Sequence, residues 1–312
     1  MPIRRVILDT DIGTDVDDAC ALALALRSPE IRLEAVTVVY GDVELRARIV
    51  RKLLAIAGPK YADVPVGKGV GQPLLGKRPV YWAGHEGQGI LGPDEPPMPP
   101  DTPHAVDLIV STVLDNPGEI TLLSIGPLTN LATAVVREPT LSHRVKEVIL
   151  MGGVVRLGDS LSFPWAEHNI RCDPEAAHIV FSAGWPITMV GLDVTLQVTI
   201  QREQLRRLSA VDSPLNRAVV DQLDRYMTNC GRNFTYLHDP LALAVAIDPS
   251  LVRLVPMHVD VETRGEFTSG ATVACLPSKS DPRSEQNANV AVAVDVNRFL
   301  EFFFGRLSRP ME

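Results

Sequence analysis

The sequence predicts an α/β fold: a doubly wound, mostly parallel sheet flanked by helices, with added antiparallel strands. Two patterns carry this prediction. Short β-rich runs alternate with helical patterns along the chain, as they do in successive βαβ units. These runs are almost continuously apolar, which is typical of strands covered on both faces. The 312 residues contain neither an internal repeat nor a low-complexity linker, so we expect a single domain over residues 1–312.

Each expected element has its own signal. The strands are the apolar runs at residues 5–8, 33–39, 120–124, 148–151 and 187–190. A helix follows from the helical spacing of Leu45, Ile49, Leu53 and Ile56, and Gly58 with Pro59 ends it. The Pro-rich residues 93–103 are expected to form a surface loop, followed by a helix at about 104–116. An antiparallel region is expected from 254 to 276, and residues 290–294 then lead into a closing helix that ends near residue 306.

Composition narrows the classes of partner. Asp and Glu outnumber Lys and Arg by 38 to 30, and the formal charge of -8 argues against nucleic acid or an anionic membrane as partner. A small neutral or cationic ligand fits better. The four cysteines show no C-x-x-C spacing, and no apolar run is long enough to span a bilayer. We therefore expect a cytoplasmic protein.

An acidic cluster follows the first strand directly. Five carboxylates lie within ten residues, and an Ala/Leu-rich helix runs from there through Leu26; the five are Asp9, Asp11, Asp15, Asp17 and Asp18. In an open α/β sheet this is the carboxyl end of a strand, where ligands bind. Two unit charges ~4 Å apart repel by about 4 kcal/mol near a protein surface, so a bound cation would relieve the cluster. Oxygen ligands without Cys or His select a hard ion, calcium or magnesium.

An acidic cluster of this kind has three other interpretations. N-capping with a solvated acidic turn explains a lone Asp but not this density. An EF-hand loop counted from Asp9 needs Gly at the sixth position and Glu at the twelfth, where the chain has Thr14 and Cys20. A phosphotransferase with Asp9 or Asp11 as aspartyl nucleophile also begins with D-x-D after the first strand, and this alternative stays open.

Four segments together resemble the nucleoside hydrolase family, of the inosine/uridine-preferring type. They occur in the family's order and span residues 9–241. The first is Asp-Thr-Asp-x-Gly followed by Asp17-Asp18-Ala19, and the second is Ser-Ile-Gly-Pro-Leu-Thr-Asn-Leu-Ala at 124–132. The third joins Met-Gly-Gly at 151–153 to Ala-Glu-His-Asn at 166–169 and Asp-Pro-Glu-Ala-Ala at 173–177, and the fourth is His-Asp-Pro-Leu-Ala at 238–242.

The resemblance implies the nucleoside hydrolase fold and a calcium-dependent hydrolysis of the N-glycosidic bond of ribonucleosides. It makes the side chains of Asp11, Asp18 and Asp239 calcium ligands, with Ile125 binding through its backbone carbonyl. It assigns the ribose-binding role to the central segment with Met151, the 2'- and 3'-hydroxyls to Asp17 and Asn169, and the 5'-hydroxyl to Glu167. His85 lies where the family has a mobile loop over the base. It also suggests a homodimer or homotetramer.

Chemistry supplies two catalytic candidates. Cleavage builds positive charge on the sugar, so a water is needed on one face and assistance for the departing base on the other. Calcium alone would not ionise its water at neutral pH, which makes Asp11 our choice for the base. His238, with an ordinary pKa near 6.5, is our choice for protonating the leaving group. A non-catalytic nucleoside- or ribose-binding protein on the same fold is a further alternative.

The sequence departs from the family pattern at several positions. Two extra residues, introducing Asp15, lie between Gly13 and the Asp17-Asp18 pair. Asp42 stands where the family has an Asn, and His168 stands where an aromatic side chain is common. The segment 158–163 lacks an Asn that usually contacts the 5'-hydroxyl. Base contacts are open, and the aromatic candidates for stacking are Tyr226, Phe234 and Tyr236.

Overall fold

The computed structural model of the protein describes residues 3–155, 163–280 and 285–309. Within these residues, nine strands form one sheet in the order β10-β9-β11-β6-β5-β4-β1-β2-β3, and two short strands, β7 and β8, pair separately. The strands are β1 (Arg4–Thr10), β2 (Ile31–Val38), β3 (Val66–Lys68), β4 (Ile120–Ser124), β5 (Glu147–Met151), β6 (Ile187–Val190), β7 (Thr199–Gln201), β8 (Phe234–Tyr236), β9 (Val252–Val261), β10 (Thr272–Cys275) and β11 (Ala288–Val294).

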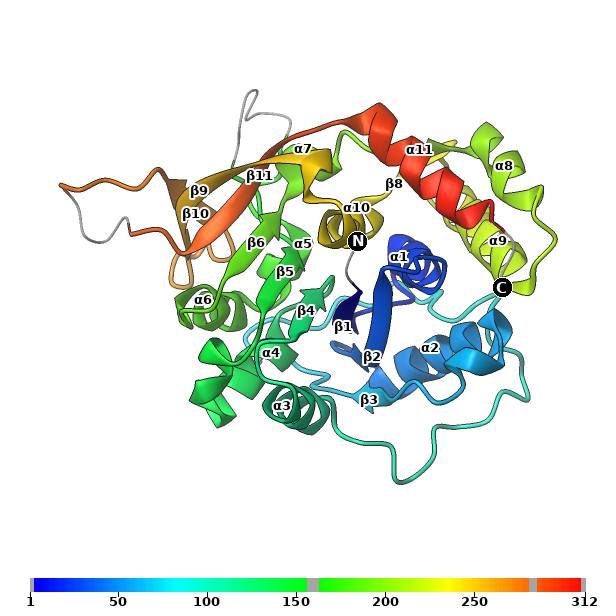
Figure 1. Ribbon diagram of the computed structural model, residues 1–312, viewed down its shortest axis with the longest axis horizontal. Coiled ribbons are helices and arrows are strands. Elements are labelled where there is room, and N and C mark those ends of the chain that lie inside the picture. Colours follow the sequence, from blue (N-terminus) through cyan, green and yellow to red (C-terminus); the bar gives the residue numbers. More distant parts are fainter. Residues whose placement is uncertain (1–2, 156–162, 281–284, 310–312) are drawn as a thin grey trace.

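Helices cover both faces of the sheet (Figure 1). They are α1 (Asp17–Leu26), α2 (Val43–Ala57), α3 (Ala105–Asp115), α4 (Thr129–Arg137), α5 (His168–Cys172), α6 (Pro174–Ser182), α7 (Leu192–Thr195), α8 (Leu205–Ser209), α9 (Pro214–Asn229), α10 (His238–Ile247) and α11 (Val296–Leu307). Short 3-10 helices occur at Pro59–Tyr61, Pro139–His143, Arg202–Gln204 and Pro249–Leu251.

The two larger hydrophobic cores of the described residues lie on opposite faces of the sheet. Along β1, Val6 and Leu8 join the core that contains α1, α2, α10 and α11, whereas Ile7 joins the core of α3, α4 and α6. This alternation follows from the two-residue period of a strand. Because both faces are covered, the central strand β4 is buried at all five of its residues. The near-continuous apolar runs in the sequence have this cause.

The strand order reverses at β1. This strand pairs in parallel with β2 on one side and with β4 on the other, while β4, β5 and β6 continue away from it. Such a switch point opens a crevice at the carboxyl ends of the strands, where ligands bind in doubly wound sheets. The chain therefore places the ends of β1 and β4, separated by more than a hundred residues, next to one another.

The predicted fold class is confirmed, including the antiparallel strands: β9 runs antiparallel to β11 and β10 antiparallel to β9. All five predicted strands are present as β1, β2, β4, β5 and β6, and the predicted helices appear as α1, α2, α3 and α11. Residues 93–103 form a loop, as expected. β3, β7 and β8 were not predicted, because strands of three residues are too short to show a period.

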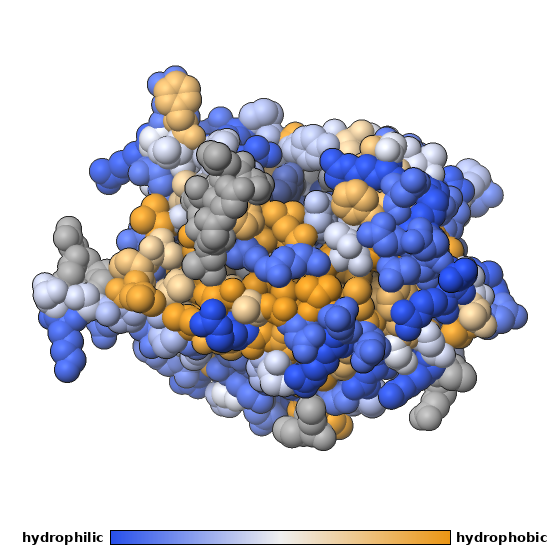
Figure 2. All heavy atoms as spheres, turned by 90° about the horizontal axis from the view of Figure 1, so that it is seen from above, coloured by the Kyte–Doolittle hydropathy of each residue, from blue (hydrophilic) through white to orange (hydrophobic). Residues whose placement is uncertain are grey.

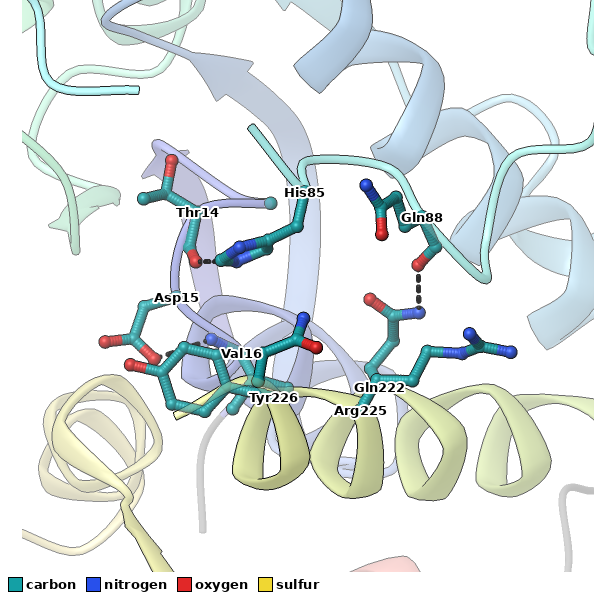
Figure 3. Close-up of a pocket in the computed structure, with 10 residues that line it drawn as sticks. Thr14, Asp15, Val16, His85, Gln88, Gln222, Arg225 and Tyr226 are labelled. Atoms are coloured by element: carbon teal, nitrogen blue, oxygen red, sulfur yellow. Dashed lines mark hydrogen bonds between the residues drawn. The ribbon is translucent and has the colours of Figure 1, made fainter. Parts of the chain in front are cut away.

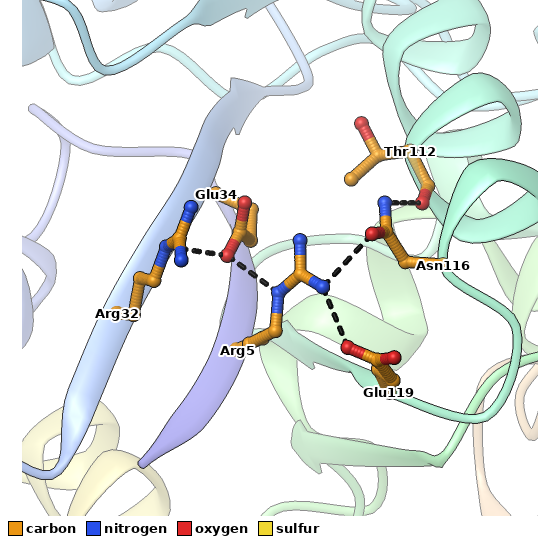
Figure 4. A network of polar contacts seen from close by, with 6 residues as sticks. All are labelled: Arg5, Arg32, Glu34, Thr112, Asn116 and Glu119. Carbon is orange, nitrogen blue, oxygen red and sulfur yellow. Dashed lines mark hydrogen bonds and ion pairs between the residues drawn. The ribbon is translucent and has the colours of Figure 1, made fainter.

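The amino ends of the strands carry a polar network on the side away from the crevice (Figure 4). The Arg5 guanidinium donates to Glu34 (2.7 Å), Asn116 (2.8 Å) and Glu119 (2.6 Å), and Arg32 pairs with Glu34 (2.9 Å). This network ties β1 and β2 to the turn between α3 and β4. Among the described residues, every helix is too short or too polar to cross a bilayer.

Candidate active site

A cavity of about 580 Å³ opens at the carboxyl ends of the strands. This volume lies in the range of pockets that bind small molecules. All ten residues that the sequence analysis assigned to the site line it. They come from the ends of β1, β4 and β5 and from the first turns of α1, α5 and α10, with His85 arriving from a long loop. The structure thus brings the predicted residues together around one space.

Three buried carboxylates form the acidic centre of this cavity. Oxygen atoms of Asp17, Asp18 and Asp239 lie within 4.8 Å of one another, and each residue is at most 4% exposed. Burial, followed by repulsion from neighbouring carboxylates, raises the pKa of all three well above the usual range. Their helices, α1 and α10, begin at this point, but a helix N-terminus offsets only about 0.3–1 kcal/mol per charge. The cluster therefore fits a cation bound by hard oxygen ligands.

Local hydrogen bonds fix the orientation of these carboxylates. The Thr10 hydroxyl donates to Asp18 Oδ1, and the backbone amide of Asp239 donates to Asp17 Oδ2 (3.1 Å). Asp17 was predicted to bind ribose and Asp11 to bind metal. In the structure Asp17 belongs to the group of three, whereas Asp11 lines the same cavity outside that group.

Asp11 lies against the end of β4. A Cβ added at Gly126 would lie 2.8 Å from the Asp11 amide nitrogen and 2.9 Å from its Oδ1, so this close approach depends on the glycine. The preceding residue, Ile125, lines the cavity, and its carbonyl accepts a hydrogen bond from Asn169 Nδ2 (3.0 Å). Ile125, whose carbonyl is predicted to bind metal, thus lines the same cavity as Asp11.

Asp9 has a different role from its neighbours. Its Oδ1 accepts hydrogen bonds from Thr37 (2.6 Å) and Asn130 (2.7 Å), and it does not line the cavity. Burial raises its pKa to about 7. It supports the end of β1 from beneath the site, which removes it as a candidate nucleophile.

The central segment supplies the opposite wall. Glu167 caps α5, and its carboxylate accepts hydrogen bonds from the amides of Gly153 (3.0 Å), Asn169 (2.8 Å) and Ile170 (3.1 Å). Burial raises the pKa of Glu167. Asn169 also donates to the Met151 carbonyl (3.1 Å), so Met151, Glu167 and Asn169 form one connected surface.

The other end of the cavity holds imidazole and phenol groups. His238 Nδ1 hydrogen-bonds with the Thr195 hydroxyl (2.7 Å), and its ring lies 5.0 Å from that of Tyr236. Burial lowers the pKa of His238 to about 4, so its imidazole is neutral at pH 7. Figure 3 shows His85 turned toward Thr14, whose carbonyl lies 2.8 Å from Nε2, with Tyr226 rising from α9 beside it.

Other residues named in the sequence analysis lie around the site. Of the three candidate stacking aromatics, Tyr226 lines the cavity, whereas Tyr236 packs behind His238 and Phe234 packs on Tyr236. Asp42 caps α2 by accepting from the Leu45 amide (2.9 Å) and is not part of the cavity. His168 lines the cavity and meets Tyr81 edge to face. Residues 158–162 lie outside the described part of the chain.

Sequence reasoning missed several residues at the site. Tyr81, Thr195 and Arg46 contribute to the cavity or support it, and no motif marks them. For Arg46 the sequence offered only a weak signal, its place in α2 next to the apolar stripe. A charged residue at such a place is ordinarily exposed, so its burial was not expected. Its burial depends on carbonyl groups contributed by distant parts of the chain.

Comparison with known proteins agrees with this geometry. Residues 6–301 match the family model described as inosine-uridine preferring nucleoside hydrolase. The inosine-uridine preferring nucleoside hydrolase of Crithidia fasciculata is 39% identical over 98% of each chain. The pyrimidine-specific ribonucleoside hydrolase RihA of Salmonella gallinarum is 35% identical over 97% of each chain.

Solved structures give the same result. A plant nucleoside hydrolase, PpNRh1, superposes with a TM-score of 0.87 at 33% identity and covers 99% of this chain and 100% of its own. A purine-preferring ribonucleoside hydrolase from Gardnerella vaginalis has a TM-score of 0.83 at 32% identity and 98% coverage of both chains. These likenesses set aside the phosphotransferase and binding-only alternatives. The chain belongs to the inosine-uridine preferring nucleoside hydrolase family and is an N-ribohydrolase that acts on ribonucleosides.

Proposed function

We propose that this N-ribohydrolase depends on calcium and that the residues predicted above carry out the hydrolysis in the roles stated there. The main support for this proposal is that Asp17, Asp18 and Asp239 are buried with their carboxylate oxygens within 4.8 Å of one another. They line the same cavity as Asp11 and Ile125. Buried like charges at this density are stable only when a cation or protons compensate them. The side chains of Asp11, Asp18 and Asp239 and the carbonyl of Ile125 would hold the ion.

The bound ion would supply Lewis acidity and a fixed attachment point for the sugar. The chain's own groups perform the remaining steps. Asp11 accepts the proton of the attacking water, for which its position against Gly126 at the cavity wall is suited. Asp17 and Asn169 bind the 2'- and 3'-hydroxyls, Met151 lies beneath the sugar, and Glu167 accepts from the 5'-hydroxyl. Groups that read hydroxyls in a buried site reject deoxy analogues strongly.

His238 assists the departing base. The Thr195 hydroxyl fixes Nδ1, and Tyr236 packs against the ring, so the imidazole is held in one orientation at the cavity wall. With Thr195 donating to Nδ1, the single proton of the neutral imidazole resides on Nε2. The neutral ring cannot transfer this proton without becoming an imidazolate, so Nε2 would donate a hydrogen bond that stabilises the negative charge on the departing base, and water would complete the protonation. His85 and Tyr226, which line the same end, close around the base.

The direct test is a panel of purine and pyrimidine ribonucleosides. The proposal predicts release of free ribose and free base from at least one member, no release from the 2'-deoxy analogues, and loss of release with a calcium chelator. Release that persists unchanged after complete metal removal would contradict the calcium dependence. The relatives named above are described as pyrimidine-specific in one case and purine-preferring in another, so the panel must include both classes of nucleoside.

We further propose that the chain acts in the cytoplasm as a homodimer or homotetramer. All four cysteines are free, which suits a reducing compartment. Figure 2 shows hydrophobic side chains gathered on the face that is uppermost in Figure 1, around β9 and β11. Partly exposed apolar residues continue from there into α11, among them Val294, Val296 and Leu300. Contiguous apolar surface of this kind is typical of subunit interfaces, and light scattering after gel filtration would give the mass.

A further inference from the structure

Arg46 of α2 is fully buried beside the acidic cavity, at 0% exposure. Its guanidinium donates to the carbonyls of Asp11, Ile12 (2.8 Å) and Tyr40 (2.6 Å) and to the Thr14 hydroxyl (3.0 Å). These acceptors lie just after the ends of β1 and β2. The Arg46 side chain therefore holds both the loop after β1 and the loop after β2.

The loop after β1 requires such a donor. It is two residues longer than the family motif, and in the structure the carbonyls of Asp11 and Ile12 face inward. Buried carbonyls without a donor are costly, and the planar fork of an arginine satisfies several at fixed angles. Gly13, which follows, has a φ of +118° and packs against Ile49 of the same helix, three residues from Arg46. Two residues of α2 thus set the path of the loop that carries Asp11.

The same side chain is connected to the loop that carries His85. Trp82 lies over the Arg46 guanidinium, with 5.1 Å from Cζ to the ring centroid. The Thr14 hydroxyl, which accepts from Arg46, donates to Glu86 Oε1 (3.1 Å), and Glu86 also accepts from the amides of Ala83 (2.8 Å) and Gly84 (2.7 Å). The path Arg46–Thr14–Glu86 joins the acidic loop to the segment above the base end of the cavity.

We propose that Arg46 is a positioning residue for the metal centre: it holds Asp11 where this carboxylate, together with Asp18 and Asp239, binds the ion, and it orders residues 82–86 over the base. This inference rests on the proposed calcium dependence. Arg46 also contributes a buried positive charge close enough to act on the Asp18 carboxylate. Loss of a group that orients ligands typically weakens metal affinity by about 10- to 100-fold.

The test compares Arg46→Met and Arg46→Lys with Arg51→Met as the matched control. Arg51 lies on the same helix and donates to a single carbonyl, that of Ala62 (2.9 Å), away from the cavity. Calcium dissociation constants are measured by calorimetry on chelator-treated protein, and melting temperatures are recorded with and without calcium. We expect the calcium dissociation constant to rise about tenfold or more in Arg46→Met, to rise less in Arg46→Lys, and to match the wild type in Arg51→Met.

The outcomes separate the two proposals. If the wild type binds calcium and both Arg46 variants bind it equally well, Arg46 is merely structural and the inference is wrong, even if their melting temperatures fall. If the wild type binds no calcium, the proposed function fails and the inference fails with it. If Arg46→Met does not fold, Arg46→Lys and Thr14→Val decide the matter, because each preserves the side-chain volume and weakens only part of the network.

Discussion

At the scale of single residues, the main feature of this protein is a cluster of three buried aspartates, Asp17, Asp18 and Asp239. Their carboxylate oxygens lie within 4.8 Å of one another. Their pKa values are raised by burial and by mutual repulsion, so in the absence of a cation each carboxylate destabilises the others. The same arrangement that costs folding stability provides affinity for a divalent ion. Function and stability therefore oppose one another at this cluster, and substitutions there should separate them.

Asp18→Asn should show this separation. Removing one of the buried like charges relieves a repulsion of about 4 kcal/mol per close pair near a protein surface. The chelator-treated variant should therefore melt about 2 °C or more above the equally treated wild type. Calcium should no longer raise its melting temperature, and kcat should fall about 100-fold or more. Scanning calorimetry with and without calcium measures both effects.

The control for this substitution is Asp63→Asn, which changes an exposed carboxylate and should leave both properties as in the wild type. A chelator-treated Asp18→Asn protein that melts well below the wild type would contradict the view that these carboxylates repel one another in the folded state.

Gly126→Ala tests the close approach of β4 to Asp11. The added methyl group would lie 2.8 Å from the Asp11 amide nitrogen, so Asp11 must move. Small displacements of a reacting group cost on the order of 10- to 100-fold in rate, and we expect kcat/KM to fall by about that factor. Gly92→Ala is the control, because its Cβ would meet nothing within 4 Å. Equal activity of the two variants would show that Asp11 tolerates the shift.

The role of a single residue can be predicted from the sequence when its partners are close to it in the chain, and cannot be predicted when they come from distant segments. Asp11 and Asp9 are two residues apart on one strand end and look equivalent in sequence. Only the structure distinguishes Asp9, bound to Thr37 and Asn130, from Asp11, which lines the cavity. Arg46 could not be predicted because its acceptors come from the ends of two strands and from a turn in which Tyr40 has a φ of +66°.

At the scale of elements, the hydrophobic pattern was sufficient to predict the longer strands and helices. The strands at the centre of the sheet are nearly continuous in apolar residues, and α2 has an apolar stripe, so their positions could be predicted closely. The antiparallel pair β7 and β8 has three residues in each strand and follows no readable pattern, yet it leads directly into His238. Short elements around a site are fixed by tertiary contacts rather than by local sequence.

The closing helix α11 is held to the start of β2 by an ion pair. Arg306 donates to Glu30 (2.6 Å). Burial, the largest single effect, raises the pKa of Glu30, but the hydrogen bond from Arg306, a backbone hydrogen bond and the charge of Arg306 act together against it, and the pKa lies below its usual range. For a carboxyl with a lowered folded-state pKa, the stabilisation is present above the unfolded value and is lost as the pH falls through the folded one.

Glu30→Gln should therefore lower the melting temperature at pH 7, and this difference should shrink toward zero as the pH falls through the lowered folded-state pKa and the wild-type carboxyl is protonated. Paired melting curves of wild type and variant across this range measure it. A difference that stays constant with pH would show that the pair stabilises α11 by packing and not by charge.

At the scale of the whole molecule, the sheet order explains why motifs so far apart share one site. The reversal at β1 puts the ends of β1 and β4 side by side, and the packing of α10 against α1 brings Asp239 to Asp17 and Asp18. The order of the motifs along the chain indicated the family, and the family indicated the fold. Composition and periodicity alone predict a doubly wound sheet, but they do not predict that the four motifs meet at one site.

One continuous nine-stranded sheet runs through the molecule, which supports the proposal of a single domain. On that basis we expect the chain to unfold in one cooperative transition, with calcium shifting the transition as a unit.

The central claim is that aspartates from the loop after β1, from α1 and from α10 together bind a metal ion that the reaction needs. The most direct measurement is a calorimetric titration of chelator-treated protein with calcium, paired with an assay of ribose release from its best ribonucleoside substrate. We predict one calcium ion per chain, recovery of ribose release in step with binding, and loss of both in Asp239→Asn. A chelator-treated protein that takes up no divalent ion and still releases ribose at the full rate would contradict the account.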